Sequence, residues 1–479
     1  MKVIKNYFYN SSYQIFLIIL PIITLPYVSR ILGPTYLGIN SYTYSLTNYF
    51  VLFAVLGTTV YGQREIAYLR NNRRGRSVLF WELEFLNLLT TGISFLVLVM
   101  VIFGMPNYHI FMWAYSINVI ANVFDVSWLF MGTERFSVLV IRNFFVKITS
   151  VVLIFTLVKS SDDLITYVLI NSLSVLFSNL LLWPYLKELI SFDVKVLLPD
   201  MHPFQHLRGT IALFVPQISI TLYTVLNKII LGYMGKIREE SYFDNSDKIV
   251  RLVFTVLTSL STVLMPVVAG EISKGKSENV QKLLKLSLSF SLFIVFPLCF
   301  GLIALSSQLI PLFLGNQYRG AIILLQIQSV ILIPMTIANV IGNQYLVPSR
   351  KSRQLNVSII TGSIFNILVS FPLIYYYGAL GAAYAILMSE SLVTVMQVIQ
   401  VKGMLLFKGM GGDLVKAFMS ALVMGLVVLL EQSLLSGWIS IIFGIGLGVV
   451  VYACVLLMCR TRLVKYVVKE YKIRRKTFG

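Results

Sequence analysis

The most suggestive chemical pattern in the sequence is GEISKGKS at residues 270–277, which fits the phosphate-binding loop G-x-x-x-x-G-K-[ST]. Such a loop needs a buried strand before it and a helix after it, because backbone N–H groups and a helix N-terminus must converge on the phosphates. Here long apolar runs flank the pattern and leave no room for a sheet. We therefore predict a turn between two membrane helices, which Gly270 and Gly275 allow and to which Lys274 and Lys276 add positive charge.

The histidines and cysteines do not form a recognisable catalytic or metal site. HPFQH at 202–206 has two histidines four residues apart, but it lacks the glutamate of the zinc-protease motif and has Pro203 after the first histidine. The three cysteines, at 299, 454 and 459, lie within or at the end of apolar runs without metal or disulfide spacing. We expect no catalytic residues, no metal and no cofactor, and a protein that is not an enzyme.

The elements that position the remaining polar residues are membrane helices. Hydrophobic residues make up 57% of the chain and charged residues only 12%, against about 25% charged in soluble domains. Many apolar runs approach the roughly 20 residues that cross a bilayer. The sequence predicts an all-α polytopic membrane protein with about fourteen transmembrane helices, at 12–31, 37–61, 78–103, 109–131, 137–158, 164–186, 210–234, 242–268, 283–306, 320–346, 355–376, 381–401, 414–433 and 437–459.

Lys and Arg are concentrated in the N-terminal segment, in every second connection between these helices and in the C-terminal tail. An excess of these residues marks the cytoplasmic side of a membrane, so both termini are predicted to be cytoplasmic. The net charge of +19 is therefore spread along the chain, and we expect no nucleic-acid partner. The basic tail is expected to lie along anionic headgroups, and a helix that docks a partner is the alternative.

The first and seventh predicted helices are weakly similar to each other. Each has an early proline, then a cation (Arg30 or Lys228), then ILG and finally SY. Internal repeats are how many transporters build a substrate site between two bundles. We predict two pseudo-repeated six-helix bundles at 1–190 and 210–405, a cytoplasmic linker at 191–209, two additional helices within 406–460 and a basic tail at 461–479.

Ionisable residues at bilayer depth are expensive and are therefore functional candidates. A water-filled chamber lined by cations would attract an anionic substrate, and the candidate binding residues are Arg30, Lys147, Lys228, Lys248 and Arg251. The candidates for ion coupling are Asp244, Asp247 and Glu390. Two alternatives remain open. Residues near helix ends, including Glu82 and Glu84, could reach the headgroups instead, and the i,i+4 pairs in 244–251 could form a salt-bridge ladder with no ligand.

Three motifs carry a resemblance to a known family: PYVSRILGPTYLG at 26–38, YGQREIA at 61–67 and DVSWLFMGTERF at 125–136. Together they resemble the Wzx-type polysaccharide or oligosaccharide flippases of the multidrug/oligosaccharidyl-lipid/polysaccharide exporter superfamily. The last motif has the spacing associated with these proteins, in Asp125, Trp128, Gly132, Glu134 and Arg135. We expect these five to have structural or gating roles. Candidate bending points are Pro26, Gly33, Pro216 and Gly232, for which helix-end punctuation is the alternative.

The resemblance implies a transporter that flips a polyprenyl-pyrophosphate-linked oligosaccharide from the inner to the outer leaflet of a bacterial cell membrane. Alternating access of the two halves, synthesis of capsule or O-antigen-like polymers, and partnership with a polymerase and glycosyltransferases of the same pathway follow as expectations. A multidrug or cation antiporter of the same superfamily, a membrane glycan polymerase and a scaffold role are the alternatives. The excess of intramembrane cations argues against the antiporter, and the lack of a large outer loop argues against the polymerase.

Overall fold

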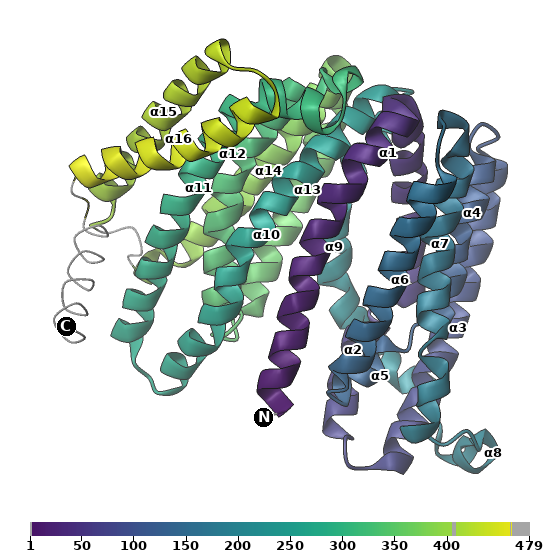
Figure 1. The fold of residues 1–479 in the computed structure, drawn as a ribbon. Helices are drawn as coiled ribbons and strands as arrows, with labels where there is room; N and C mark the ends of the chain where they lie inside the picture. Colours follow the sequence, from purple (N-terminus) through teal and green to yellow (C-terminus); the bar gives the residue numbers. More distant parts are fainter. Residues whose placement is uncertain (1, 405–408, 460, 462–479) are drawn as a thin grey trace. The chain divides into compact units, whose positions relative to one another are not determined.

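The computed structural model describes residues 2–404, 409–459 and 461, and in these ranges it contains helices and no strand. The chain divides into two compact units, Met1–Ser241 (unit 1) and Tyr242–Gly479 (unit 2), whose helices are labelled in Figure 1. Among the described residues, eleven helices are long and apolar enough to cross a membrane, or thirteen if each of two bent pairs is one span. The predicted all-α polytopic class is therefore confirmed.

Unit 1 contains the α-helices α1 (Lys2–Val55), α2 (Thr58–Tyr68), α3 (Arg73–Phe103), α4 (His109–Val123), α5 (Ser127–Gly132), α6 (Phe136–Leu157), α7 (Leu164–Leu180), α8 (Val194–Leu197) and α9 (Leu207–Tyr233). Its four 3₁₀ turns are η1 (Ser161–Asp163), η2 (Trp183–Glu188), η3 (Leu198–Asp200) and η4 (Pro203–His206). α10 (Ile237–Ser273) begins in unit 1 and continues into unit 2.

Unit 2 continues with α11 (Ser277–Phe313), α12 (Ala321–Ile341), α13 (Ser352–Tyr377), α14 (Ala379–Gln400), α15 (Gly411–Leu434) and α16 (Gly437–Met458). Shorter turns are η5 (Asn316–Tyr318), η7 (Lys402–Met404) and the π-helical η6 (Gly342–Leu346), which extends α12. α11 packs against α12, α15 and α16, and α14 packs against α12 and α13.

α1 is a 54-residue helix that is broken at Gly33, where φ is 73° and ψ is 173°. Only glycine adopts this conformation easily, and Pro34 follows it, so the chain turns at this point. Figure 1 shows α1 rising from the N-terminus and folding back before α2. The predicted helices 12–31 and 37–61 correspond to the two arms of α1, but the second arm ends at Val55, because Leu56 and Gly57 have positive φ before α2 begins.

The turn at 270–277 joins two helices, as predicted for this phosphate-loop-like sequence. α10 continues to Ser273, and Gly275 has φ 71°, so that the N–H of Lys276 donates to the carbonyl of Glu271 at 3.2 Å. The prediction for Gly275 is confirmed, whereas that for Gly270 is wrong because Gly270 lies inside α10. In the described residues a helix, not a strand, precedes the loop, which removes the geometry that phosphate binding requires.

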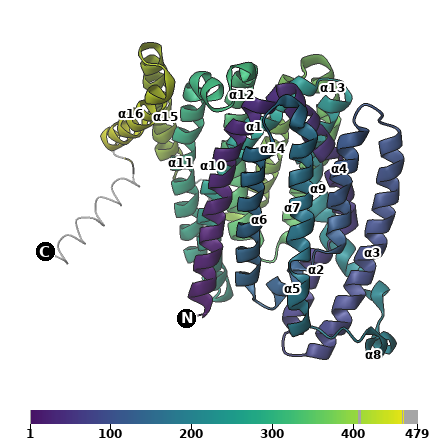
Figure 2. The same ribbon diagram turned by 45° about the vertical axis from the view of Figure 1, so that its right-hand side comes forward.

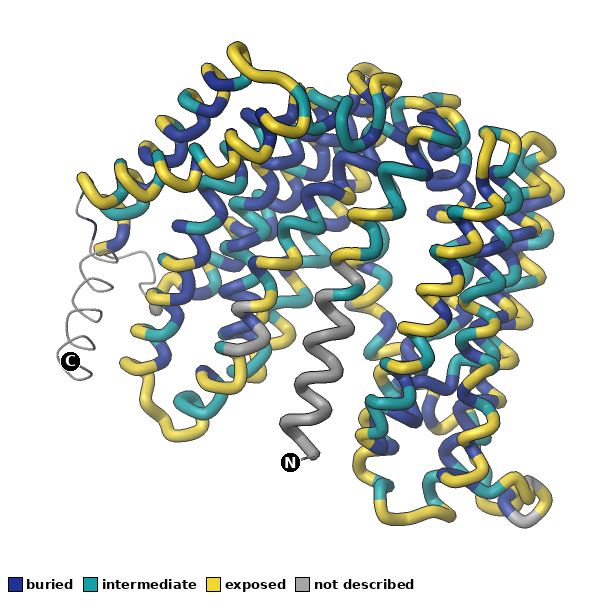
Figure 3. The backbone as a smooth tube through the Cα atoms, viewed as in Figure 1, coloured by how far each residue is buried: buried dark blue, intermediate teal, exposed yellow. Residues whose placement is uncertain are grey.

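The helices of unit 1 bury their mutual contacts and expose apolar side chains on their outer faces. α4 packs against α1, α3 and α7, and α6 packs against α1 and α7; Figure 2 shows α3, α4 and α7 as neighbours. Figure 3 shows buried positions where the helices of a unit face one another and exposed positions on the opposite sides. A large exposed apolar surface is expected where lipid, and not water, surrounds a protein.

The predicted division into two six-helix bundles stays a prediction. The compact units meet between Ser241 and Tyr242, within α10, and α9 packs against α1 and α2 of unit 1. α15 and α16 occupy the region predicted for two additional helices. Apart from Thr461, the predicted tail at 461–479 lies outside the described residues.

Candidate functional site

The motifs at 61–67 and 125–136 pack against each other in unit 1. Trp128 of α5 is 2% exposed and stacks on Phe80 of α3, with ring centroids 5.7 Å apart. A Cβ on Gly62 of α2 would lie 2.5 Å from the Trp128 ring, and a Cβ on Gly132 would lie 2.7 Å from Ile66. Both glycines therefore allow α2 and α5 to approach closely. The two motifs thus form one joint between α2, α3 and α5.

Charged residues of the same motif lie at the ends of α5. Asp125 accepts a hydrogen bond of 3.0 Å from the backbone N–H two residues on, at the start of the helix. After the helix, Glu134 has φ 57° and pairs with Arg70 at 2.8 Å, while Arg135 pairs with Glu188. Because both pairs are exposed, each contributes less than about 1 kcal/mol. The five motif residues thus lie at a structural joint, and a gating role for them stays a prediction.

The second arm of α1 packs against α9 from one end to the other, within unit 1. Contacts along this seam are Tyr42 with Gly232, Tyr49 with Leu222 and Phe53 with Phe214. Two further close approaches flank it, one between Gly38 and Ile237 at the start of α10 and one between Gly57, before α2, and Thr210 of α9. A Cβ on Gly232 would lie 2.0 Å from the Tyr42 ring, so this glycine is a close-packing position. α9 bends by 51° between Leu222 and Thr224, away from Pro216 and Gly232. Their role as hinges, like that of Pro26, stays a prediction.

The candidate binding cations of unit 1 lie on three helices. Arg30 is exposed on α1, three residues before the break at Gly33, and Lys228 is half-buried on α9. Lys147 is exposed on α6, beside the exposed apolar side chains of Phe145 and Ile148. An ammonium group on an apolar helix face is costly in lipid unless it finds water or an anion. These placements are compatible with a role in binding an anion but do not test it.

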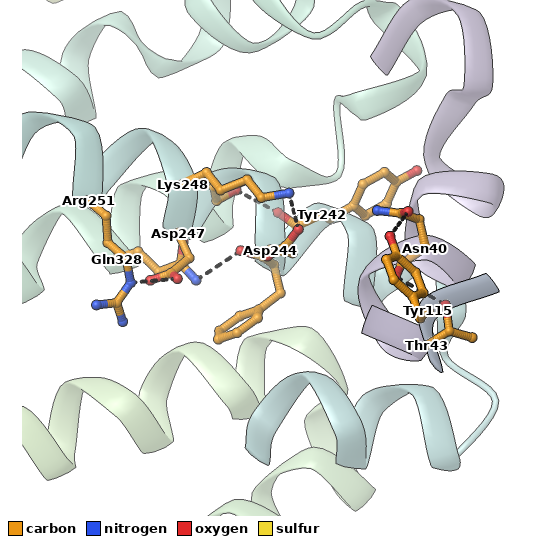
Figure 4. A network of polar contacts seen from close by, with 11 residues as sticks. Asn40, Thr43, Tyr115, Tyr242, Asp244, Asp247, Lys248, Arg251 and Gln328 are labelled. Carbon is orange, nitrogen blue, oxygen red and sulfur yellow. Dashed lines mark hydrogen bonds and ion pairs between the residues drawn. The ribbon is translucent and has the colours of Figure 1, made fainter. Parts of the chain in front are cut away.

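The charged residues of α10 in unit 2 form the i,i+4 ladder that the sequence left open. Asp244 and Asp247 are buried, and they pair with Lys248 and Arg251 respectively; the Arg251 Nε lies 2.8 Å from the Asp247 carboxylate. Figure 4 shows both pairs, with the amide of Gln328 donating to a neighbouring backbone carbonyl. The ladder is thus locally neutral, and a phosphate would have to compete with the aspartates for its cations.

The third coupling candidate, Glu390, is 5% exposed on α14. Its backbone carbonyl accepts a 2.8 Å hydrogen bond from Thr394, which also donates to the carbonyl of Pro334 on α12. The same figure shows a separate contact of unit 1, in which the Tyr115 hydroxyl donates to Asn40 at 2.6 Å. Burial of all three coupling candidates agrees with the expectation that carboxylates in a membrane face protein.

A buried cluster around Glu82 was not predicted from the sequence. The Glu82 carboxylate lies 2.9 Å from Nε2 of His206, whose Nδ1 lies 2.9 Å from the Tyr61 hydroxyl. Gln205 and the backbone N–H of His202 also donate to Glu82. A cavity of about 400 Å³ borders this cluster and is lined by α2, α3 and the segment before α9. The expectation that Glu82 reaches the headgroups is wrong, because these donors hold it inside.

No group of three or more metal-ligating side chains occurs in the part of the chain that the structure describes. HPFQH instead connects α9 to α3: His206 binds Glu82 through its side chain and His202 through its backbone. The i,i+4 spacing of His202 and His206 could predict only that the two share a helix face. It could not predict the contact with Glu82, because Glu82 is more than a hundred residues away in sequence.

A family model described as "Polysaccharide biosynthesis protein" matches residues 3–270, more than half of the sequence. The chain belongs to this family. A protein of Escherichia coli (strain K12) named "Putative O-antigen transporter" is 23% identical over 393 residues, which cover 81% of this chain and 94% of that protein. The Haloferax volcanii protein "Probable low-salt glycan biosynthesis flippase Agl15" is 20% identical over 252 residues, 51% of this chain and 52% of that one.

Two solved structures show the fold of this polysaccharide biosynthesis protein. The lipid II flippase MurJ in an inward closed conformation superposes with a TM-score of 0.72 at 16% identity, covering 93% of this chain and 97% of that one. An inward-facing multidrug transporter of the MATE family superposes with a TM-score of 0.60 at 14% identity, covering 81% and 96%. With its many apolar helices, the chain is a multi-pass protein of the inner membrane.

Proposed function

We propose that the protein flips a polyprenyl-pyrophosphate-linked oligosaccharide repeat unit from the inner to the outer leaflet of the bacterial cell membrane. The observation that carries this proposal is the family match over residues 3–270. Relatives named for O-antigen transport and glycan flipping support it, as does the fold shared with a lipid II flippase. The product would serve an O-antigen-like or capsular polymer, with a polymerase and glycosyltransferases of the pathway as partners. No enzymatic step is required.

In this proposal the pyrophosphate binds mainly to the two cations on α1 and α9. Arg30 precedes the Gly33 break and Lys228 lies on the helix that packs along the second arm of α1. Lys248 and Arg251 already pair with aspartates, so an arriving phosphate gains less from them. Lys147 is exposed on α6 beside the apolar side chains of Phe145 and Ile148, and in this proposal it meets the phosphate from the lipid side. We expect the loss of either Arg30 or Lys228 to slow flipping.

The transport cycle is proposed to follow alternating access between two six-helix halves. Both termini are cytoplasmic in this scheme, and the 50 residues of Ile19–Tyr68 account for two crossings, because a helix of that length would far exceed a bilayer of about 30 Å. In this scheme Ile19–Tyr68 counts as two crossings and each bent pair as one, so the eleven apolar helices and two bent pairs correspond to the fourteen crossings expected from hydropathy. The seam between the second arm of α1 and α9 would have to open during the cycle, and Asp244, Asp247 and Glu390 are candidates for ion coupling.

The test uses purified protein in liposomes loaded with the lipid-linked oligosaccharide, and measures the fraction accessible to an external glycan-cleaving enzyme. Arg30→Ala and Lys228→Ala are expected to lower the flipping rate at least tenfold. Lys159→Ala, which removes an exposed lysine after α6, is the matched control and should flip normally. Normal flipping by both site variants would show that the cationic-site idea is wrong. Export of drugs without glycan flipping would favour the antiporter instead.

A further inference from the structure

Glu84 on α3 is a buried carboxyl group that the proposed substrate route does not use. Its side chain is 7% exposed, and neither carboxyl oxygen has a hydrogen-bond partner. Moving an ionised carboxylate out of water without donors is so unfavourable that such a group takes a proton instead. This environment contrasts with that of Glu82 two residues earlier, whose oxygens meet several donors.

The packing of α3 against α4 brings Glu84 beside a second carboxyl group. The two helices run antiparallel, and Asn87 and Asn122 contact each other: the Asn122 amide donates to the Asn87 side chain at 2.6 Å, and the Asn87 amide donates to the Asn122 carbonyl at 3.0 Å. One turn back along α3 is Glu84, and one turn forward from Asn122 is Asp125. This register brings the Asp125 carboxyl group to the same level of the helix pair as Glu84.

Several features near this pair disfavour a second negative charge, although the backbone N–H of Ser127 donates to Asp125 at 3.0 Å. Two carboxylates that share a buried site cannot both ionise easily. Asp125 also follows the C-terminal end of α4, where the helix dipole is negative. On the same face of α4, the side-chain oxygen of Asn118 is buried and has no hydrogen-bond partner. The Glu84 carboxyl group therefore has acceptors nearby and no donor of its own, which is the condition under which a carboxyl group binds a proton.

The ionisable groups named here from the surrounding elements either have partners elsewhere or are exposed. Arg73 and Arg76 of α3 donate to backbone carbonyls of η2 and the residues that follow it. His206 of η4 pairs with Glu82, Arg64 of α2 pairs with Glu65, and Arg74 at the start of α3 pairs with Asp200. Lys195 of α8 and Arg30 of α1 are exposed. The described residues also lack a group of three or more metal-ligating side chains. A proton therefore fits this pair better than a metal ion.

We propose that Glu84, with Asp125 as its neighbour, is a proton-binding site within unit 1, which holds one proton while the site is closed to water and releases it when transport admits water. The first half of this inference is independent of transport, whereas the second half rests on the proposed function. The exchange is a simple dissociation: the Glu84 O–H bond breaks, the proton passes to water, and the carboxylate keeps the electron pair. Intramembrane carboxyl groups serve as proton relays in many pumps and transporters.

The binding step is tested by infrared difference spectroscopy of the purified full chain in lipid. At neutral pH the wild type is expected to show the carbonyl band of a protonated carboxyl group, and Glu84→Gln is expected to lose it. Glu84→Asp should retain such a band, and Glu278→Gln, at the exposed start of α11, is the matched control that should leave it unchanged. Asp125→Asn should change the pH at which the band disappears. A band that is absent from wild type, or persists in Glu84→Gln, would overturn the site.

The release step is tested by measuring proton flux together with flipping in the same liposomes. The wild type should move protons during flipping, and Glu84→Gln should lose at least nine-tenths of that flux per oligosaccharide flipped. Unchanged flux in Glu84→Gln, or flipping that needs Na⁺ and moves no proton, would overturn the release step. If the wild type flips no lipid-linked oligosaccharide, the proposed function fails, while the infrared result still decides whether Glu84 binds a proton.

Discussion

Replacing Gly232 by alanine distinguishes a packing position from a hinge. A Cβ at this position would lie 2.0 Å from Cδ2 and 2.3 Å from Cγ of Tyr42, whereas unstrained carbon atoms approach to about 3.5–4.0 Å. Tyr42 is 2% exposed, and its ring also contacts Tyr108 with centroids 5.4 Å apart. The ring therefore has little room to withdraw, and either α9 or the second arm of α1 must shift.

The expected cost follows from two opposing effects. Forcing an extra methyl group into a packed site costs about 1–3 kcal/mol, while replacing a helical glycine gains about 0.5–1 kcal/mol. We expect Gly232→Ala to destabilise the protein by a net amount of about 1–2 kcal/mol. The measurement is the midpoint of thermal unfolding of the purified protein in detergent. Gly92→Ala on α3 is the matched control, because a Cβ there meets nothing within 4 Å, and its midpoint should stay or rise.

A second substitution shows whether Tyr42 causes the loss. Tyr42→Ala creates a cavity and is itself destabilising, but the double variant with Gly232→Ala should lose less than the sum of the single losses, because the added methyl group then occupies free space. Strict additivity, or equal midpoints for Gly232→Ala and Gly92→Ala, would refute the packing argument. A variant with normal stability and lost flipping would instead support the hinge.

Two further substitutions test the turns. Gly33→Ala places a side chain in a backbone region that is open essentially only to glycine. It should therefore lower the free energy of unfolding by about 1–3 kcal/mol, measured by thermal unfolding. An unchanged unfolding midpoint would show that the break does not need glycine. Lys276→Ala removes the lysine of the phosphate-loop-like sequence. The flipping rate should stay unchanged, since this residue lies in a turn between α10 and α11. Loss of flipping in a stably inserted variant would contradict the prediction that Lys276 has only a turn role.

The positions of the helices were predictable because bilayer thickness sets the length of each apolar run. The predicted 283–306, for example, lies within α11 (Ser277–Phe313). The extra turns at the start of this helix, 277–282, could not be predicted from hydropathy, because most of their residues are polar and extend the helix ahead of the apolar run. The break at Gly33 was marked by a glycine followed by a proline, yet only the backbone shows that the two arms form one interrupted helix.

Local chemistry in the candidate site was also predictable, whereas distant pairing was not. The α10 ladder follows from i,i+4 spacing alone, and both pairs form. The contact between Gly62 and Trp128 joins two motifs that the sequence presents separately, and the partner of Glu82 is a histidine in the predicted cytoplasmic linker. Sequence periodicity assigns a residue to a helix face, but it does not identify the helix that covers this face.

Glu82 and Glu84 show what this means for function. For both, contact with the headgroups was one of the open alternatives, and they have the same side chain on the same helix, two residues and therefore about 200° apart. One faces the segment before α9 and is satisfied by His206, Gln205 and a backbone N–H. The other faces the end of α4, where Asp125 and oxygen acceptors offer no donor. Because the same group is hydrogen-bonded on one face and unpartnered on the other, the neighbouring helix, and not the side chain itself, decides which glutamate can carry a proton.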